Sequence, residues 1–278
     1  MPLIHSPDDP SHINNVELLL QGIICGLVVE NCINAIAIIL KLRCGRSARR
    51  EQKENSVPLL MLANNAANIV YSLTSPFIFY NQVTCAPMAR LCNFSSHVFF
   101  LTYDIFVLFA AYIISNRHVW VKNVSAVLVL NRFGWAVYDI YESYGYFDIE
   151  FQFCEYAQHP ISAYYNMADI ASDCFATLVT ILVAILRLGG RSNVSVRLIE
   201  RNLLRSIIIV ATSIFIVFMG LNWVNQFWIG WGFAFQAYVL ARLMNLDLMY
   251  GESLDKRLQK KTVLQFMFKD DFIDSAAA

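Results

Sequence analysis

The sequence is poor in charged residues. Only 15% of its 278 residues are Asp, Glu, Lys or Arg, whereas 57% are hydrophobic. A soluble domain of this length carries about 25% charged residues, so the shortage argues against a water-soluble globular protein. Long apolar stretches are present instead, and a helix that crosses a bilayer needs roughly 20 mainly apolar residues. The composition therefore predicts an all-α membrane protein.

Residues that several classes of membrane protein need are also missing. No lysine occurs between Lys122 and Lys256, so the last apolar stretch cannot hold the lysine of a retinal Schiff base. The histidines are scattered along the chain, which argues against a zinc site built from about three convergent ligands. The sequence has no Gly-rich phosphate loop and no placed Ser–His–acid set. We therefore expect no metal, no cofactor, no nucleic-acid binding and no enzymatic activity.

Seven apolar stretches are long enough to cross a membrane. The run from 206 to 241 is too long for one crossing, and the polar patch at 220–226 divides it in two. The predicted spans are 16–41, 57–81, 95–117, 119–139, 160–186 and the two halves of 206–241. The sequence thus predicts a seven-transmembrane helix bundle over residues 16–250.

The basic residues indicate the orientation of these spans. All of the 21 lysines and arginines except Arg90 and Arg132 lie at or near the ends of the first, third, fifth and seventh spans or in the segments that follow them. Basic loops stay in the cytoplasm, so residues 1–15 are predicted to be extracellular and the tail 251–278 cytoplasmic. The tail can form a short amphipathic helix on the membrane surface. An ordinary polar tail is the alternative.

Three cysteines fall on the predicted oxidising side. Cys154 lies in the loop between the fourth and fifth spans, and Cys85 and Cys92 precede the third span. A disulfide from Cys154 to this region would hold the loop over the bundle. We expect the pair Cys92–Cys154, with Cys85 as the competing partner.

Two residues at opposite ends of the region around the third span lie at a notable spacing. Cys92 and Arg117 are 25 residues apart, which on one continuous helix is roughly 37 Å, enough to reach opposite membrane faces. This pattern resembles the rhodopsin-like (class A) G-protein-coupled receptors, in which a disulfide cysteine precedes the arginine of an Asp-Arg-Tyr triplet by the same interval. The resemblance implies that Asn116, Arg117 and His118 couple to a heterotrimeric G protein. Snorkelling of an arginine at a helix end is the alternative.

The sequence also departs from that family. Asn116 stands in place of the acid that normally pairs with the arginine, and no proline follows Pro160 to kink the last helices. These departures are similar to those of divergent chemosensory serpentine receptors. Because no acid restrains Arg117, the resemblance implies some activity without ligand.

Polar and aromatic residues within the spans are the candidates for ligand binding and for contacts between helices. A mostly aromatic cavity suits a small, apolar or aromatic ligand, although tyrosine and tryptophan also anchor membrane interfaces. The predicted ligand-binding residues are His97, Phe100, Tyr103, Asp104, Tyr164, Tyr165, Asp169, Trp223 and Gln226. The predicted interhelical polar network is Glu30, Asn34, Asn65, Asn68 and Asp247. For Asp104, pairing with Arg132 is the structural alternative.

We therefore expect an integral membrane receptor, in the plasma membrane, that binds a small external molecule and signals through a cytoplasmic G protein. The alternative function is a seven-helix ion channel or transporter that uses intramembrane charges such as Glu30, Asp104, Arg132 and Asp169. A continuous water-filled path would favour conduction, whereas an outer cavity closed at mid-membrane would favour a receptor. A homo-oligomer is compatible with either function.

Overall fold

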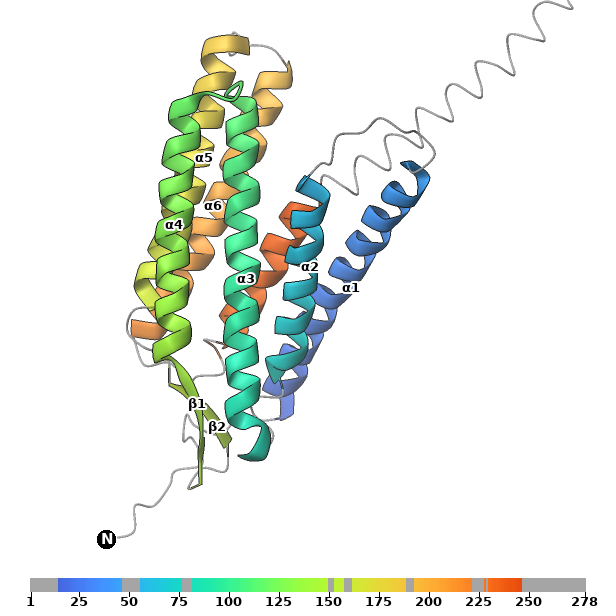
Figure 1. Ribbon diagram of the computed structural model, residues 1–278. Helices are drawn as coiled ribbons and strands as arrows, with labels where there is room; N and C mark the ends of the chain where they lie inside the picture. Colours follow the sequence, from blue (N-terminus) through green and yellow to red (C-terminus); the bar gives the residue numbers. More distant parts are fainter. Residues whose placement is uncertain are drawn as a thin grey trace, which may run out of the picture.

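A bundle of seven helices dominates the computed structural model, which describes residues 15–46, 56–76, 82–149, 153–157, 162–188, 193–221, 228 and 230–246. The labelled helices are α1 (Asn15–Arg46), α2 (Ser56–Thr74), α3 (Gln82–Ile114), α4 (Val119–Glu142), α5 (Ser162–Leu188) and α6 (Asn193–Leu221) (Figure 1). A seventh helix spans residues 230–246. Three helical segments are long and apolar enough to cross a membrane, namely Leu19–Lys41, Val83–Ile114 and Tyr164–Leu186. The structure thus confirms the prediction of an all-α helical bundle and shows that three of its helices could cross a membrane.

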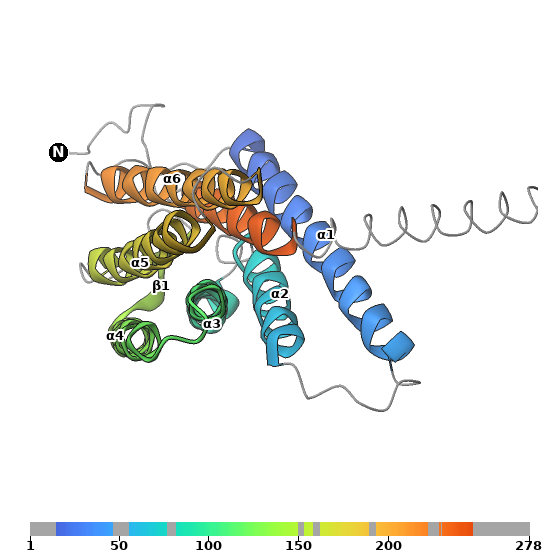
Figure 2. The ribbon, with the colours of Figure 1, turned by 90° about the horizontal axis from the view of Figure 1, so that it is seen from above.

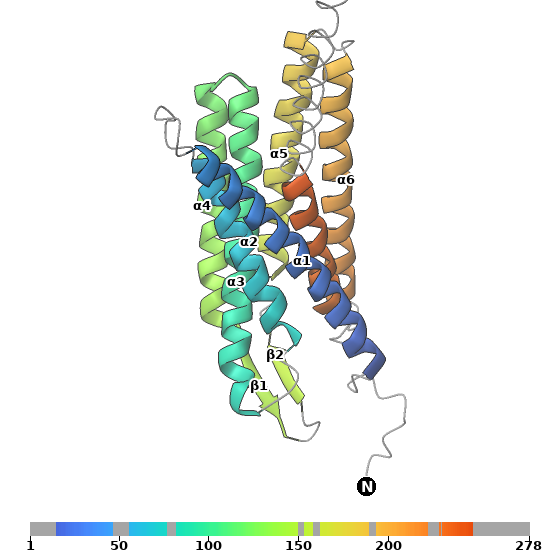
Figure 3. The same ribbon diagram turned by 90° about the vertical axis from the view of Figure 1, so that its right-hand side faces the viewer.

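Helix α3 is the central element of the bundle. It packs against α2, α4 and α5, and it lies among these three helices when the bundle is seen from above (Figure 2). Its buried residues recur at spacings of three and four, so they share the face that points into the bundle. They include Phe99, Tyr103, Val107 and Ala111. Helix α1 packs on α2 and crosses the bundle at a slant (Figure 3).

A β-hairpin between α4 and α5 was not predicted from the sequence. Strand β1 (Tyr144–Asp148) pairs antiparallel with β2 (Phe153–Ala157), and Phe147 lies opposite Cys154. The hairpin docks on the first turns of α3, because a Cβ added to Gly145 would lie 2.4 Å from Cβ of Ala89. Glycine is the residue that allows this close approach between the strand and the helix.

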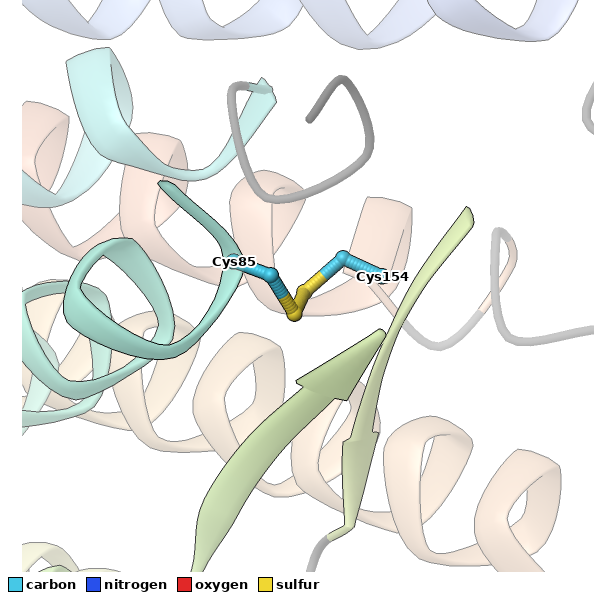
Figure 4. The surroundings of a disulfide bond; sticks show 2 residues. All are labelled: Cys85 and Cys154. Atoms are coloured by element: carbon cyan, nitrogen blue, oxygen red, sulfur yellow. A yellow bond between two sulfur atoms is a disulfide. The ribbon is translucent and has the colours of Figure 1, made fainter. Parts of the chain in front are cut away.

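The disulfide of this hairpin differs from the predicted pair. Cys154 is bonded to Cys85 (Figure 4). Cys92 is a buried free thiol. The predicted pair Cys92–Cys154 is wrong because α3 begins at Gln82 rather than near residue 95. Cys85 is therefore at the end of α3 that the hairpin reaches. Cys92 lies about 10 Å further along the helix axis.

Helix α3 also ends earlier than predicted. It stops at Ile114, and the next residues form a tight turn in which Asn116 and Arg117 have φ angles of 60° and 61°. The backbone N–H of Arg117 donates to the carbonyl of Tyr112 at 2.9 Å, which closes the helix. Left-handed residues at this position are a common way to end a helix. Arg117 is therefore outside α3, and the prediction of one continuous helix from Cys92 to Arg117 is wrong.

Helix α2 is likewise shorter than its predicted span of 57–81. It ends at Thr74, and the sequence continues with Ser75-Pro76. The residue before a proline is disfavoured in the α conformation, so the helix stops here. The predicted extracellular segment up to residue 14 and the predicted amphipathic tail, 251–278, lie outside the described residues.

Candidate functional site

Arg132 is the centre of a buried charged cluster between α3, α4 and α5. It lies on the face of α4 that also buries Ser125, Ala136 and Asp139, and its exposed fraction is 0%. The opposite side of α4 exposes large apolar side chains, among them Val127, Leu130, Phe133 and Val137. Because its own face is closed off from solvent, Arg132 must find its partners inside the protein.

The main partner of Arg132 is Asp169 of α5. The Nε atom of Arg132 donates a hydrogen bond to Oδ1 of Asp169, and the two side chains form a buried ion pair. The guanidinium also lies over the rings of Tyr165, at 5.1 Å, and Phe100, at 6.0 Å. Such contacts of a cation with aromatic faces add to the attraction when water is excluded. The cluster therefore joins α4 to both α3 and α5.

His97 connects Arg132 to a second acid. Its Nδ1 atom lies 3.2 Å from Nη1 of Arg132, and its Nε2 atom lies 2.8 Å from Oδ2 of Asp139. A guanidinium can only donate hydrogen bonds, so Nδ1 of His97 must accept and Nε2 must carry the hydrogen that is donated to Asp139. This geometry assigns the neutral form to His97. Asp139 also accepts a hydrogen bond from the hydroxyl of Ser143 at 3.0 Å.

Ser143 links the charged cluster to the hairpin. It is the C-terminal cap of α4, and β1 begins at the next residue, Tyr144. A row of hydrogen bonds thus runs from the base of the hairpin through Asp139, His97 and Arg132 to Asp169. Hydrogen-bonded side chains therefore connect the base of the hairpin to the centre of the bundle.

Asp104 of α3 completes the cluster. Its exposed fraction is 3%, and its side chain lies within hydrogen-bonding reach of Asp169. Arg132 also acts on Asp104 electrostatically, but its direct bond goes to Asp169. The predicted alternative of a direct Asp104–Arg132 pair is therefore replaced by an Asp169–Arg132 pair with Asp104 beside it. Four buried polar atoms here have no partner among the described residues, namely Oδ2 of Asp104, Oδ2 of Asp169, Nη2 of Arg132 and Oη of Tyr103.

A second ion pair joins α5 to α6. Arg205 Nε donates to Asp173 Oδ1 at 3.1 Å, and Arg205 Nη2 donates to Thr177 Oγ1 at 3.3 Å. The hydroxyl of Ser206 donates to the other oxygen of Asp173. Asp169, Asp173 and Thr177 follow one another at intervals of four residues, so they share one face of α5. The i, i+4 spacing of the two acids was the signal that could have revealed this second pair in the sequence.

Amide side chains connect the helices on the other side of α3. Asn65 of α2 and Asn245 of the seventh helix exchange two hydrogen bonds, of 3.1 and 2.8 Å. Asn64 donates to the carbonyl of Phe99 at 2.9 Å, and Asn68 donates to the carbonyl of Ala237 at 3.5 Å. Of the predicted polar network, the structure thus places Asn65 and Asn68 between helices.

Two predicted members of that network face outward. Glu30 and Asn34 are exposed on α1, whereas Asn31 is buried and accepts a hydrogen bond from Arg242 at 3.3 Å. The reason is the helical period, because residues one position apart are rotated by about 100° around the helix axis. Including Glu30 and Asn34 in the network was therefore wrong. Asp247 lies outside the described residues.

The predicted ligand-binding residues separate into three groups. Tyr164 is 53% exposed and stacks on Trp135 at 5.0 Å, so it does not point into the charged cluster. Trp223 and Gln226 lie outside the described residues. The other predicted residues are buried in or beside the charged cluster, and they are His97, Phe100, Tyr103, Asp104, Tyr165 and Asp169. The structure thus brings most of the predicted set together, but as a packed polar core rather than as an open aromatic cavity.

The predicted coupling residues lie at the opposite end of the bundle from the hairpin (Figure 1). Asn116, Arg117 and His118 are all exposed, in the short turn that joins α3 to α4. Nδ1 of His118 accepts a hydrogen bond from the backbone N–H of Trp120 at 3.3 Å and caps α4. Arg117 is held in place by the turn, and its side chain is accessible to another molecule.

Comparisons with known proteins identify no relative of this chain. No protein-family model matches it, and no curated protein matches it. Its function is therefore inferred from the residues and the geometry above.

Proposed function

We propose that the protein is a plasma-membrane receptor that binds a small external ligand and signals through a heterotrimeric G protein. The observation that carries this proposal is the connection between the hairpin and the buried charged cluster. The disulfide Cys85–Cys154 holds the hairpin on α3, and Ser143 at its base is hydrogen-bonded to Asp139 of the cluster. A ligand that displaces the hairpin would therefore also displace groups in the centre of the bundle.

All seven helices cross the membrane in this proposal, with the amino terminus outside and the tail in the cytoplasm. Helices α2, α4 and α6 do not contain any of the three candidate membrane spans, but each exposes large apolar side chains. Examples are Leu59 on α2, Leu130 on α4 and Ile214 on α6, with exposed fractions of 58%, 67% and 59%. Side chains of this kind favour contact with lipid over contact with water. The oxidised pair Cys85–Cys154 supports an extracellular hairpin.

The ligand would act by changing how α5 packs between α3 and α6. Asp169 ties α5 to Arg132 of α4, and Asp173, one turn further along α5, ties it to Arg205 of α6. A movement of α5 at the first pair is therefore transmitted to α6 through the second pair. In the receptor, the ligand shifts the population between two such packings.

The G protein would bind at the turn Asn116–His118. Arg117 is exposed there and has no acidic partner among the described residues. It can therefore pair with a partner protein without first breaking an ion pair, which is the physical reason to expect activity without ligand. Lys122, one turn into α4, is exposed on the same end of the bundle.

The row of ionisable groups also favours a second function, namely an ion channel or transporter. Acids and arginines recur from Asp139, near the hairpin, to Arg205 on α6, which is the arrangement that a path for ions or protons needs. Their pairing with each other favours the receptor, because a conducting path needs groups that are free to bind and release ions.

One pair of measurements on the same lipid vesicles distinguishes the two functions. Purified protein is tested for nucleotide exchange on a panel of G proteins and, separately, for ion and proton flux across the vesicle membrane. The receptor is supported by exchange without flux. Flux without exchange on any G protein would replace the receptor by the channel or transporter.

A further inference from the structure

Asp104 of α3 and Asp169 of α5 form a pair of buried carboxyl groups. Their exposed fractions are 3% and 6%, and their side chains lie within hydrogen-bonding reach of each other. The Oδ2 atom of each has no partner among the described residues. A carboxylate has only acceptor oxygens, so two carboxylates cannot hydrogen-bond to each other unless one of them carries a proton.

The positive charge near this pair is too small to balance two carboxylates. Within the described part of the chain, Arg132 is the one cation bonded to the pair, and its bond goes to Asp169. His97 accepts a hydrogen bond from Arg132 and is neutral, so it adds no positive charge. Arg205 is already paired with Asp173. Two ionised carboxylates beside a single guanidinium would leave one unbalanced negative charge in the interior.

An unbalanced charge at this position is expensive. Two like charges within a few ångströms of each other repel strongly where water is excluded. Removal of a charged carboxylate from water adds a further penalty. One bound proton removes both costs and fills the missing hydrogen bond.

We propose that Asp104 and Asp169 form a proton-binding site, in which a carboxylic acid on Asp104 donates a hydrogen bond to the carboxylate of Asp169. The proton is taken from water and forms an O–H bond on Asp104, and it returns to water when the site opens. Asp169 keeps its negative charge and its ion pair with Arg132. The site thus holds one proton between α3 and α5, and it holds these two helices together.

Binding of the proton is coupled to the packing of the two helices. Loss of the proton at rising pH leaves two adjacent carboxylates that repel each other, so α3 and α5 separate. By linkage, any molecule that moves α5 away from α3 lowers the affinity of the site for the proton by the same factor. The charged and titratable groups around the site are His97 and Tyr103 of α3, Arg132 and Asp139 of α4, Tyr165 and Asp173 of α5, and Arg205 of α6.

Infrared spectroscopy tests this site directly, because a neutral carboxylic acid has a C=O stretch that a carboxylate lacks. The full chain is prepared in lipid with 13C-labelled aspartate and compared with unlabelled protein at neutral pH. We expect one carboxylic-acid band that moves to lower frequency with the label. The band should disappear in Asp104→Asn, which keeps the shape of the protonated side chain. It should remain in the control Asp173→Asn, because Asp173 is ionised beside Arg205.

A second variant keeps the test decisive if Asp104→Asn does not fold. In Asp169→Asn, Arg132 becomes free to pair with Asp104, which would ionise, so the band should disappear there as well. The inference is overturned if the wild type has no label-sensitive band, or if the band survives in Asp104→Asn. If the band is absent, stabilisation of the protein by added sodium would show that a bound cation, rather than a proton, balances the charge of the two carboxylates. The band does not depend on signalling, so its absence would leave the proposed function standing.

Discussion

Loss of the buried counter-charge Asp169 should cost more stability than almost any other single change in the bundle. Arg132 is fully buried and forms an ion pair with Asp169. Asp169→Asn keeps the size of the side chain but removes the carboxylate that is bonded to the guanidinium, so that Asp104 must lose its proton to balance the charge of Arg132. Breaking a buried pair in this way costs about 3–5 kcal/mol. Arg132→Met should cost a similar amount, because it leaves Asp169 and Asp104 without their cation.

The double variant separates the ion pair from simple loss of packing. If the two charges stabilise each other, Arg132→Met combined with Asp169→Asn should cost about 2–3 kcal/mol less than the sum of the single changes. Asp173→Asn is the matched control, and about 1.5–3 kcal/mol is expected there, because its partner Arg205 is 17% exposed and can reach water. The free energy of unfolding is measured from the fraction folded against SDS in mixed micelles. Additive costs of the two single changes would refute the reasoning.

Two further predictions concern the attachment of the hairpin to α3. Cys85→Ser should lower the free energy of unfolding by up to about 4 kcal/mol, from loop entropy across a separation of 69 residues, and should make the melting temperature insensitive to reductant. Cys92→Ser should keep that sensitivity, and the opposite pattern would contradict the pairing. Gly145→Ala should weaken the docking of the hairpin, because its Cβ would meet Ala89 at 2.4 Å, and the disulfide should then be reduced faster. Gly134→Ala, with no atom within 4 Å of the added Cβ, is the control, and equal reduction rates in the two variants would contradict the prediction.

Apolar run length predicted the helices well but not their ends. The division of the run 206–241 at the polar patch agrees with the end of α6 at Leu221 and the start of the next helix at 230. The ends depend on local chemistry, such as Pro76 after α2 and the left-handed Asn116 after α3. The hairpin was missed because its strands bury only part of their residues against α3, so apolar run length does not mark them.

The members of the charged cluster were easier to predict than their pairing. Ionisable residues in apolar spans usually face the interior, as Arg132, Asp104 and Asp169 do, whereas Glu30 on α1 is an exception. Which acid bonds to Arg132 depends on how α4 and α5 are rotated about their axes, and the sequence of one helix does not contain that information. In the same way, the rotation of α1 about its own axis decides that Asn31 is buried while Glu30 is exposed.

The most direct test of the receptor is basal nucleotide exchange by the exposed turn between α3 and α4. Purified protein in lipid is assayed on a panel of G proteins as wild type, as Arg117→Ala and as Lys122→Ala. Lys122 carries the same charge and is exposed at the same end of the bundle, so it controls for a general loss of positive charge. The account predicts nucleotide exchange by the wild type and little change in the exchange rate for Lys122→Ala. For Arg117→Ala it predicts a fall in the exchange rate of about tenfold or more, as removal of about 1.4 kcal/mol of binding free energy would give. Absence of exchange by the wild type on every G protein, or equal exchange by all three proteins, would contradict it.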